Sequence, residues 1–365
     1  MGNVYAAKDF KKIESYAEDF QNGEKGYFLF FRKMAMAMQR RFVALIDHKP
    51  MPRVLIHGNP HTENYVITKS GAGMVDFDRS RIGGYAWDIV RFLCSLSLKR
   101  EESHEGEFLP PLVLEYFKEG YMRGFFAPTL PFKGFSHTES DKVQYKVWYD
   151  STKEYLAANK KWGKRLRENP LKEKDKALNK VLRGYLESRY EEGLLKQYDI
   201  EEAGTAEGTF GNSRYLAVLK HKTDKKADHI FVEVKTVYQD KDTKYYYNPY
   251  KHHGLRMIKA SNIYAPNLEQ RLGYTTYQGV EYWGREIPTA TAKIKEKMDT
   301  LEQLDIAYSV GTQLGKAHRH TLTDGARPKQ LEQHFLANYD LLCMLGQQLN
   351  GEIRDFFDRY LTADS

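Results

Sequence analysis

A strand-rich segment lies between two helix-rich segments of the chain. Residues 204–240 alternate apolar and polar side chains, and the runs LAVL and IFVEVKTV are expected to pair as antiparallel strands across the polar turn HKTDKKAD. A helix is predicted for about 255–264, and the strand-like runs RLGYTTYQ and GVEYWGREI follow it, joined around Gly279. The order strand, strand, helix, strand, strand predicts a small antiparallel sheet within an α+β fold.

The part of the chain before this segment begins with a helix and continues with short strands. Residues 26–47 place apolar side chains at spacings of three and four, which predicts one amphipathic helix. A polar loop and a glycine turn at 71–73 separate three expected strands: 54–56, 65–68 and 74–77. Helical character is expected from Ala86 to about residue 198, and again from about Lys293 to the end.

Composition limits the classes of protein and partner. With 365 residues, 41% of them hydrophobic, the chain can form two lobes that each bury a core. A formal net charge of +7 favours an anionic partner. The run 160–176 holds eight basic and three acidic residues, which we interpret as a solvated helix face, and we expect no nucleic-acid partner. No signal segment or spanning helix is evident, so we expect a cytoplasmic protein with no membrane partner.

Polar side chains are concentrated between the first short strands. The sequence HGNPHTEN, residues 57–64, forms a loop, and the strand expected at 74–77 ends near Asp76 and Asp78. Magnesium bound to nucleotide phosphates takes hard oxygen ligands, typically one or two carboxylates. Asn64, Asp76 and Asp78 could supply them; in the alternative interpretation these residues only cap turns, as Asp and Asn often do. Three such groups on adjacent strand ends favour a site.

This stretch resembles two families of proteins. The catalytic loop and metal motif of aminoglycoside-phosphotransferase-type kinases contain His-Gly-Asp-x-His-x-x-Asn and then Asp-Phe-Asp, to which residues 57–64 and 76–78 are similar. The resemblance is closer to the bacterial family catalogued as domain of unknown function 2252. In that family Gly-Asp-x-His-x-x-Asn-Phe, Asp-Phe-Asp and a Trp-Asp-x-x-Arg-x-x-x-Ser helix follow one another, as Gly58–Tyr65, Asp76–Asp78 and Trp87–Ser95 do here.

A glycine-containing segment in the second half extends the resemblance. Residues 208–215, GTFGNSRY, are similar to the family's Gly-Ser-x-Gly-Thr-Arg-x-Tyr, which would be the loop that covers the phosphates. Gly208 and Gly211 would let the backbone approach those phosphates. Lys235 resembles the strand lysine that pairs with phosphates, and kinases combine such a loop with such a lysine to neutralise a triphosphate.

The neighbours of Lys235 predict which way it points. Side chains alternate across a strand, so Val232 and Val234 are expected to face the core of the small lobe. Glu233 and Lys235 are then expected to face the other way.

The order of the motifs implies a circular permutation. In an ordinary kinase the glycine loop and the lysine precede the catalytic loop, whereas here they follow it. The helix Ala307–His318 resembles the one that stands just before that loop, and Glu286–Pro288 would be the hinge, with Glu286 beside the nucleotide. The resemblance therefore implies a two-lobed protein-kinase-like α+β fold, circularly permuted, with a small antiparallel-sheet lobe and a larger helical lobe. The catalytic loop and the helical part of the large lobe would span residues 1–199, and the small nucleotide-covering lobe would span residues 200–288. The helices that complete the large lobe would span residues 289–365.

Two residues depart from the family pattern. Asn59 stands where the family has the Asp that is expected to accept or orient the proton of the substrate hydroxyl, and an amide cannot act as that base. His253 stands where the acidic partner of the strand lysine is expected, and Glu233 and Glu269 are alternative candidates. Three explanations of Asn59 stay open: a nucleotide-binding pseudoenzyme, a different transfer such as nucleotidylation, or an engineered substitution.

The resemblance implies an ATP- and magnesium-dependent phosphotransferase or nucleotidyltransferase that acts on an unidentified small-molecule or protein acceptor. The candidate catalytic residues are Asn59, His61 and Asp76. The candidate nucleotide-binding residues are Gly208, Gly211, Lys235 and Glu286, and the candidate metal ligands are Asn64, Asp76 and Asp78. The residues assigned to support the loop are His57, His61, Asp88 and Arg91. The alternative function is a catalytically impaired nucleotide-binding pseudokinase, because Asn59 replaces the expected Asp.

Overall fold

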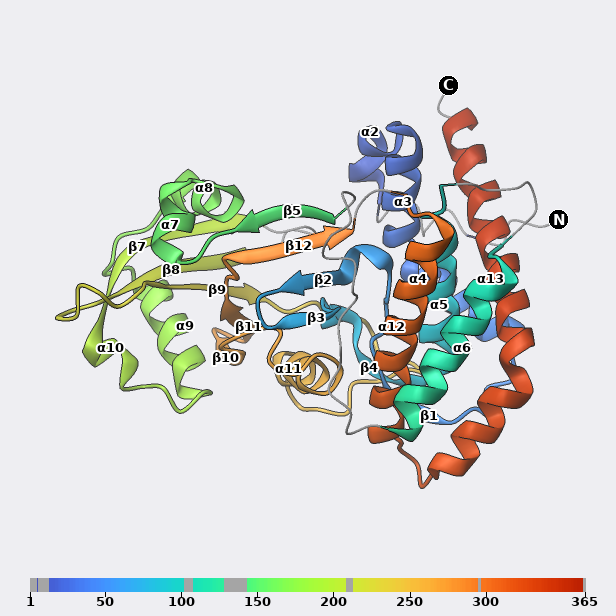
Figure 1. Cartoon of the computed structure of the whole chain (residues 1–365). Helices are drawn as coiled ribbons and strands as arrows, with labels where there is room; N and C mark the ends of the chain where they lie inside the picture. The colour runs from blue at the N-terminus through green and yellow to red at the C-terminus, as the bar shows by residue number, and fades with distance from the viewer. Residues whose placement is uncertain are drawn as a thin grey trace.

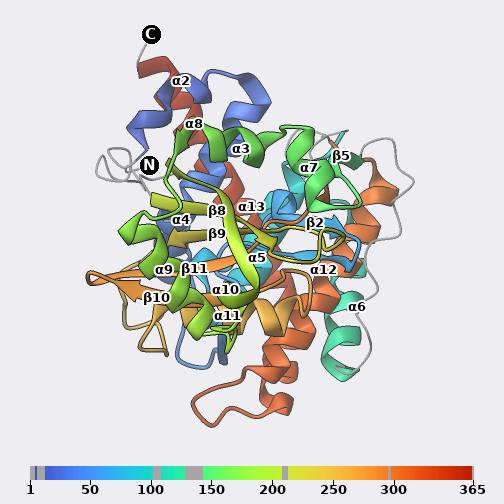
Figure 2. The same cartoon turned by 90° about the vertical axis from the view of Figure 1, so that its left-hand side faces the viewer.

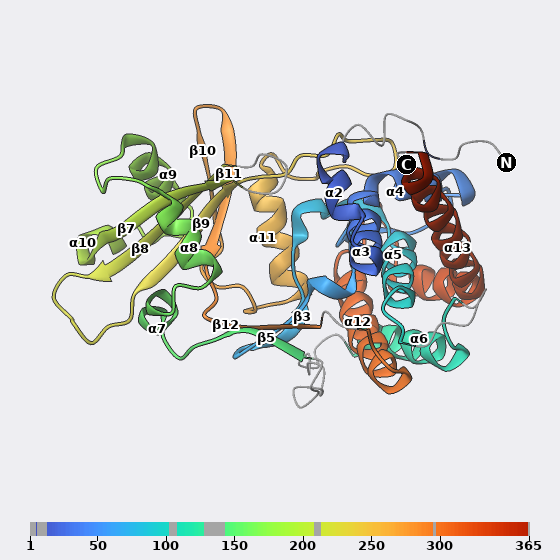
Figure 3. The same cartoon turned by 90° about the horizontal axis from the view of Figure 1, so that it is seen from above.

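The computed structural model describes residue 5 and residues 13–101, 108–127, 143–207, 213–294 and 297–363. In this part of the chain the fold is α+β, with small antiparallel sheets and a separate region of long helices. The largest sheet lies at one end of the molecule and the long helices lie at the other (Figure 1). The view from above in Figure 3 shows the same division, with the smaller strands in the middle.

Six strands form the largest sheet. Their bounds are β6 Asn169–Pro170, β7 Tyr198–Glu207, β8 Ser213–His221, β9 Ile230–Thr236, β10 Gly273–Tyr277 and β11 Val280–Glu286. In space they follow the order β10-β11-β9-β8-β7-β6, and Figure 2 shows several of them side by side. The predicted pairing of LAVL with IFVEVKTV is confirmed by the register Ala217 to Val232. The predicted join of the last two strands is confirmed too, at Gly279 with a φ of 76°.

The two faces of this sheet differ in chemistry. Val232 and Val234 are buried together with Val181 of helix α9 (Lys176–Glu187). Lys235 lines a cleft on the opposite face, and Glu233 on that face pairs with arginines. The alternation predicted for this strand is confirmed.

Short helices that precede the sheet in sequence pack against it. They are α7 Thr152–Ala157, α8 Lys161–Glu168, α9 and α10 Leu194–Gln197. Tyr155 and Leu166 are buried beside Leu216 and Phe231 of the sheet. Residues 152–197, which the sequence grouped with the larger lobe, therefore share their core with the large sheet.

Two smaller sheets hold the strands of the first half. The order β3-β2-β12-β5 joins β2 Tyr65–Thr68, β3 Gly71–Met74, β5 Val143–Trp148 and β12 Ala290–Ile294. A separate pair joins β1 Arg53–Ile56 and β4 Arg81–Gly84. The strands predicted at 54–56 and 65–68 are confirmed.

The strand predicted over 74–77 is wrong. A turn at Lys69 and Ser70 pairs Thr68 with Gly71, so the glycines expected in a turn lie inside β3, and the chain then enters the short helix η3 (Phe77–Arg79). The helix expected from about Lys293 is also wrong at its start, because Lys293 lies in β12 and pairs with Val66. Neither β5 nor β12 was predicted, since their pairing partners are distant in sequence.

Long helices form the rest of the fold. Their bounds are α3 Gly23–Lys33, α4 Ala35–Leu45, α5 Ala86–Ser97, α6 Pro111–Phe126, α11 His253–Tyr264, α12 Thr300–His320 and α13 Pro328–Ala363; the short helices are η1 Glu14–Tyr16, α2 Ala17–Phe20 and η2 Thr62–Asn64. The single helix predicted over 26–47 is wrong, because the chain bends at the buried Met34 so that Phe30 and Met38 enter the same core. The helices predicted from Ala86 and over about 255–264 are confirmed. Among the described helices, none combines the length and the apolar character that crossing a bilayer requires.

Helices α6 and α12 approach each other closely at glycines. A Cβ at Gly124 would stand 2.0 Å from the carbonyl oxygen of Thr312, and one at Gly315 would stand 2.0 Å from that of Tyr121. Both contacts are with backbone, which a change of rotamer cannot relieve. The glycines therefore fix the position of α12 against α6.

We predict that Gly315→Ala lowers the free energy of unfolding by about 1–3 kcal/mol, because the added methyl group forces the two helices apart. Gly351→Ala is the control, because Gly351 lies in α13 with no atom within 4 Å of its built Cβ. The free energy of unfolding of Gly351→Ala should rise by up to about 1 kcal/mol, because alanine has a higher helix propensity than glycine. Urea unfolding measures both, and equal effects would contradict the close packing of α6 on α12.

Candidate functional site

A cleft of about 750 Å³ lies between the large sheet and the β2–β3–β12 sheet, with α8 at its side. The large sheet contributes Arg214, Lys235, Trp283 and Arg285 to its lining, and the smaller sheet and the loop around it contribute Asn64, Asp76, Thr291 and Lys293. Among the described residues that line the cleft, nine are basic and four are acidic. The cleft therefore carries a positive potential that favours an anionic ligand.

Asp76 follows β3 with an unusual backbone conformation. Its φ is 72° and its ψ is 66°, in the left-handed region that residues other than glycine seldom adopt. Its side chain is exposed within the cleft. Strained backbone of this kind concentrates at functional sites. The turn also ends the strand, so that η3 carries Asp78 close behind Asp76.

Lys235, which lines the cleft, forms an ion pair with Asp78. The Nζ of Lys235 lies 3.2 Å from Oδ2 and 3.3 Å from Oδ1 of Asp78, although 157 residues separate them in sequence. The same ammonium lies 5.0 Å from the centre of the Trp283 ring. Lys235 also pairs in register with Arg214 on β8. The strand lysine and the two carboxylates predicted from sequence thus meet at one place.

Neighbouring charges set the ionisation of this group. Burial opposes the charge of Lys235, but Asp78 and Asp76 outweigh it and raise the pKa of Lys235 above its ordinary value. The cleft walls partly desolvate Asp76, which favours a raised pKa, yet the positive charges of Lys235, Arg32 and Lys293 outweigh this and lower the pKa of Asp76. For Asp78 burial prevails, and Asp76 adds to the rise of its pKa. Asp76 is therefore the more acidic of the two carboxyl groups.

Asn64 lies beside Asp76. The carbonyl oxygen of Asn64 accepts a hydrogen bond from the N–H of Val75 at 2.9 Å, and both Asn64 and Asp76 line the cleft. In the described ranges, no group of three or more His, Cys, Asp or Glu side chains is placed to hold a metal ion. Two carboxylates and an amide oxygen, completed by phosphate oxygens and water, fit the way magnesium binds together with nucleotides. Oxygen donors of this kind also suit calcium and manganese.

The carboxylate of Asp88 braces the loop that precedes Asn64. It accepts hydrogen bonds from the backbone N–H of His57 at 2.6 Å and of Gly58 at 2.9 Å. The hydroxyl of Tyr264 donates to it at 3.3 Å, and Nε2 of His318 lies 3.3 Å away. Asp88 itself is fully buried. The supporting role predicted for Asp88 agrees with these contacts.

Asn59 is held by Arg91. The Nε of Arg91 donates to Oδ1 of Asn59 at 2.9 Å, and Nη2 donates to the carbonyl oxygen of Phe31 at 2.9 Å. The guanidinium also lies over the Phe31 ring, 3.6 Å from its centre. Arg91 is buried, and burial lowers its pKa to about 9. Because arginine only donates, this contact orients the amide oxygen of Asn59 toward Arg91. Asn59 is not among the described residues that line the cleft.

The two histidines of the loop are buried and neutral. Nε2 of His57 lies 3.1 Å from the carbonyl oxygen of Val75, and its ring packs on Phe77. The His61 ring packs edge-on against Phe28, and burial lowers the pKa of His61 well below its usual value. Neither ring lines the cleft among the described residues. The geometry gives both histidines a supporting place, including His61, which the sequence also suggested as catalytic.

The structure places only some of the remaining candidate nucleotide-binding residues. Gly208 and Gly211 lie outside the described residues, although Arg214 lines the cleft shortly after them. Glu286 lines the cleft, where Nε of Arg271 donates to it at 2.9 Å. The backbone N–H groups of Glu286 and Ile287 bond within the protein, to the carbonyl oxygens of Gln270 and Phe231. These two hinge N–H groups are therefore already occupied.

The partner of Lys235 is not on α11. His253 begins that helix, and its backbone N–H donates to Glu281 at 2.8 Å. The two alternative candidates bind arginines instead: Glu233 pairs with Arg214 and Arg285, and Glu269 pairs with Arg285. Asp78 takes the place of the expected helix acid.

Two functional residues escaped the sequence prediction. Arg256 of α11 donates to the carbonyl oxygens of Asp78, at 3.0 Å, and of Ser80, and so supports the turn after Asp76. Lys293 lines the cleft, donates to the carbonyl oxygen of Glu63 at 2.9 Å, and has its pKa lowered by burial to about 8. Single basic residues in a helix or strand give no signal in sequence, because most of them are solvated.

A family model described as uncharacterised protein conserved in bacteria (DUF2252) matches residues 24–117 and 137–363. The chain belongs to the DUF2252 family. The family suggested by the motifs is thereby confirmed. No curated protein and no solved structure matches the chain significantly. What this DUF2252 protein does therefore rests on its own site.

We predict that Asp88→Asn lowers the free energy of unfolding of this DUF2252 protein by about 2–4 kcal/mol, because an amide leaves buried donors unpaired. The variant replaces one of two accepting oxygens by an NH₂ group that faces the N–H groups of the loop. Asp358→Asn, on an exposed face of α13, should change it by at most about 0.5 kcal/mol. Chemical denaturation compares them, and a loss no larger than in the control would contradict the bracing role.

Proposed function

We propose that this DUF2252 protein binds a nucleoside triphosphate with magnesium in the cleft and transfers a phosphoryl or nucleotidyl group to an acceptor. The observation that carries the proposal is that Lys235 and Asp76 line one basic cleft and that Lys235 pairs with Asp78 beside it, although 157 residues separate Lys235 from Asp78 in sequence. If the ion pair only stabilised the fold, the neighbouring Asp76 would not need its strained, left-handed backbone conformation. Phosphoryl transfer uses a lysine and a carboxylate-bound metal ion in this combination.

Each group has a part in this proposal. Asp76, with its lowered pKa, and Asn64 would hold the magnesium ion, and Asp78 would assist them. The metal ion would neutralise charge on the phosphate oxygens. Lys235 would exchange its contact with Asp78 for phosphate oxygens, and its raised pKa keeps it charged. The excess of basic side chains around the cleft supports a polyanionic ligand.

The order of elements supports a permuted kinase-like arrangement. The lysine lies on β9, the third strand of the consecutive antiparallel run β7, β8 and β9, as the phosphate-pairing lysine of protein kinases lies on a third strand. The helix α11 follows that strand and contacts η3 through Arg256. The loop with Asn64 and Asp76 precedes the sheet in sequence, so the proposed lobes are joined in the opposite order to that of an ordinary kinase.

A second candidate is nucleotide binding without transfer. It is favoured by the contact of Asn59 with Arg91, which uses the amide oxygen, and by the absence of a base at this position. The two candidates share the nucleotide and magnesium sites and differ only in turnover.

We predict that Lys235→Ala weakens magnesium-dependent binding of a non-hydrolysable ATP analogue by about 1.5–3 kcal/mol, the value of a lost charged hydrogen bond. Lys235→Arg should restore binding only partly, because a planar fork cannot replace a compact ammonium group in a closed site. Lys220→Ala on β8 is the control, since Lys220 is exposed and pairs with Glu201 away from the cleft. Calorimetric titration with and without magnesium measures all three, and unchanged affinity in Lys235→Ala would refute the proposed site.

We predict that the unmodified chain turns over a triphosphate slowly and that Asn59→Asp raises the rate, by up to about 100-fold if the carboxylate acts as a base. Release of diphosphate and pyrophosphate products from labelled ATP separates phosphoryl from nucleotidyl transfer. Asn59→Ala, which removes the contact with Arg91 without supplying a base, is the control. If only Asn59→Asp turns over the triphosphate, the result would support nucleotide binding without transfer in the unmodified chain. If both the unmodified chain and Asn59→Asp bind the triphosphate without turnover, the result would rule out transfer.

A further inference from the structure

We infer that the acceptor of this protein is an anion, and that its phosphate or carboxylate group binds at the α8 wall of the cleft, against Lys160 and Arg165. The inference rests on the proposed function, because it assigns the second substrate of the same cleft. It assigns a role to two residues of the basic run 160–176, which we interpreted from the sequence as a solvated helix face.

The α8 wall supplies charge that the protein does not neutralise. Five of the basic residues that line the cleft pair with carboxylates: Arg32 with Glu63, Lys69 with Asp150, Arg214 with Glu233, Lys235 with Asp78, and Arg285 with Glu269. Lys160 and Arg165 have no carboxylate partner among the described residues. Both side chains line the cleft, and Arg165 is only partly exposed.

An aromatic ring orders these cations. Trp162 lines the cleft, and three cations lie near the centre of its ring. The guanidinium of Arg165 is 5.1 Å from that centre, the guanidinium of Arg214 is 5.4 Å from it, and the ammonium of Lys161 is 5.5 Å from it. Each distance is within the range of a cation–π contact. Arg214 pairs in register with Lys235, so the wall of positive charge continues from the ion pair at Asp78 to α8.

The positive charge that remains unpaired lies at the α8 wall. The described lining has five more basic than acidic residues, but four carboxylates outside the lining pair with Arg32, Lys69, Arg214 and Lys235 and reduce the excess to one. Lys160 and Arg165 are not among these paired residues, so an anion at the α8 wall would meet positive charge that no carboxylate offsets. A polyamine acceptor, such as an aminoglycoside, would be repelled by the same wall.

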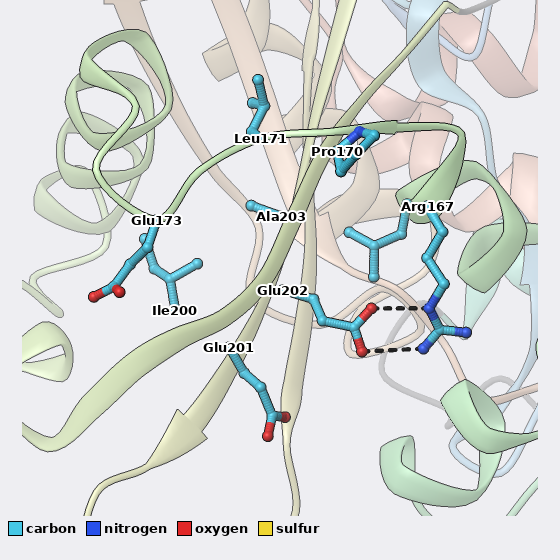
Figure 4. Close-up of a pocket in the computed structure, with 9 residues that line it drawn as sticks. Arg167, Pro170, Leu171, Glu173, Ile200, Glu201, Glu202 and Ala203 are labelled. Carbon is cyan, nitrogen blue, oxygen red and sulfur yellow. Dashed lines mark hydrogen bonds and ion pairs between the residues drawn. The ribbon is translucent and has the colours of Figure 1, made fainter.

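A neighbouring arginine on α8 shows the contrast. Arg167 points into a different pocket, where it donates to both oxygens of Glu202 at 2.9 and 3.0 Å (Figure 4). Arg165, two residues earlier, faces the cleft and has Trp162 as its neighbour. The two arginines have the same charge on one helix, and only one of them is paired. Arg167→Gln is therefore a matched control for Arg165→Gln.

The test uses inorganic phosphate as the probe on the full chain. The protein is first saturated with a non-hydrolysable ATP analogue and magnesium, which fills the triphosphate site, and phosphate is then titrated by calorimetry at low ionic strength. We expect phosphate to bind the loaded protein, and Arg165→Gln to weaken that binding about tenfold, as the loss of one charged hydrogen bond does. Arg167→Gln should leave phosphate affinity within twofold, and both variants should keep their affinity for the ATP analogue.

Each outcome separates the inference from the proposed function. No binding of the ATP analogue would overturn the proposed function and the inference with it. Binding of the analogue without binding of phosphate to the loaded protein would overturn the inference alone. Equal weakening in Arg165→Gln and Arg167→Gln would show nonspecific attraction to a basic surface and would also overturn it. Repeating the titration with Lys160→Gln, whose exposed side chain can be replaced without disturbing a core, keeps the test decisive should Arg165→Gln fold poorly.

Discussion

The buried carboxylate of Asp88 connects four separate parts of the chain. It lies on α5, accepts the N–H groups of the loop at His57 and Gly58, and contacts Tyr264 of α11 and His318 of α12. Burying a carboxylate away from water costs free energy unless hydrogen bonds compensate for its desolvation. These four segments must therefore meet at Asp88 for the core to form. The loop geometry that places Asn64 and Asp76 in the cleft depends on that convergence.

The electrostatics of the cleft follow from what surrounds it. One face of the large sheet carries Lys235 and Arg214, whereas the other face is apolar and packs on α9. Asp76 lines the opposite wall, and Lys235 binds Asp78 beside it. Basic side chains held by the sheet give the cleft a positive potential, which favours an anionic ligand. Lys160 and Arg165, which have no carboxylate partner among the described residues, extend this field toward the side of the cleft.

Asn59 is a neutral partner of a buried guanidinium. Its amide oxygen satisfies the buried guanidinium of Arg91, which an acid at this position would satisfy more strongly. Phe31 contributes a carbonyl oxygen and a ring to the same guanidinium, so the neutral partner is tolerated. The buried guanidinium of Arg91 therefore has acceptors although position 59 carries no charge.

The sequence by itself determined the short strands at 54–56 and 65–68, the direction of Lys235 and the family, because alternation and closely spaced motifs are local properties. It did not predict the strands β5 and β12, since their pairing depends on partners distant in the chain. It also missed the bend at Met34 and the end of β3 at Met74. Only the tertiary structure decided that Asp78 is the partner of Lys235, that Arg256 supports the turn and that α8 borders the cleft. These are contacts between residues far apart in sequence, and a one-dimensional pattern contains no distance between them.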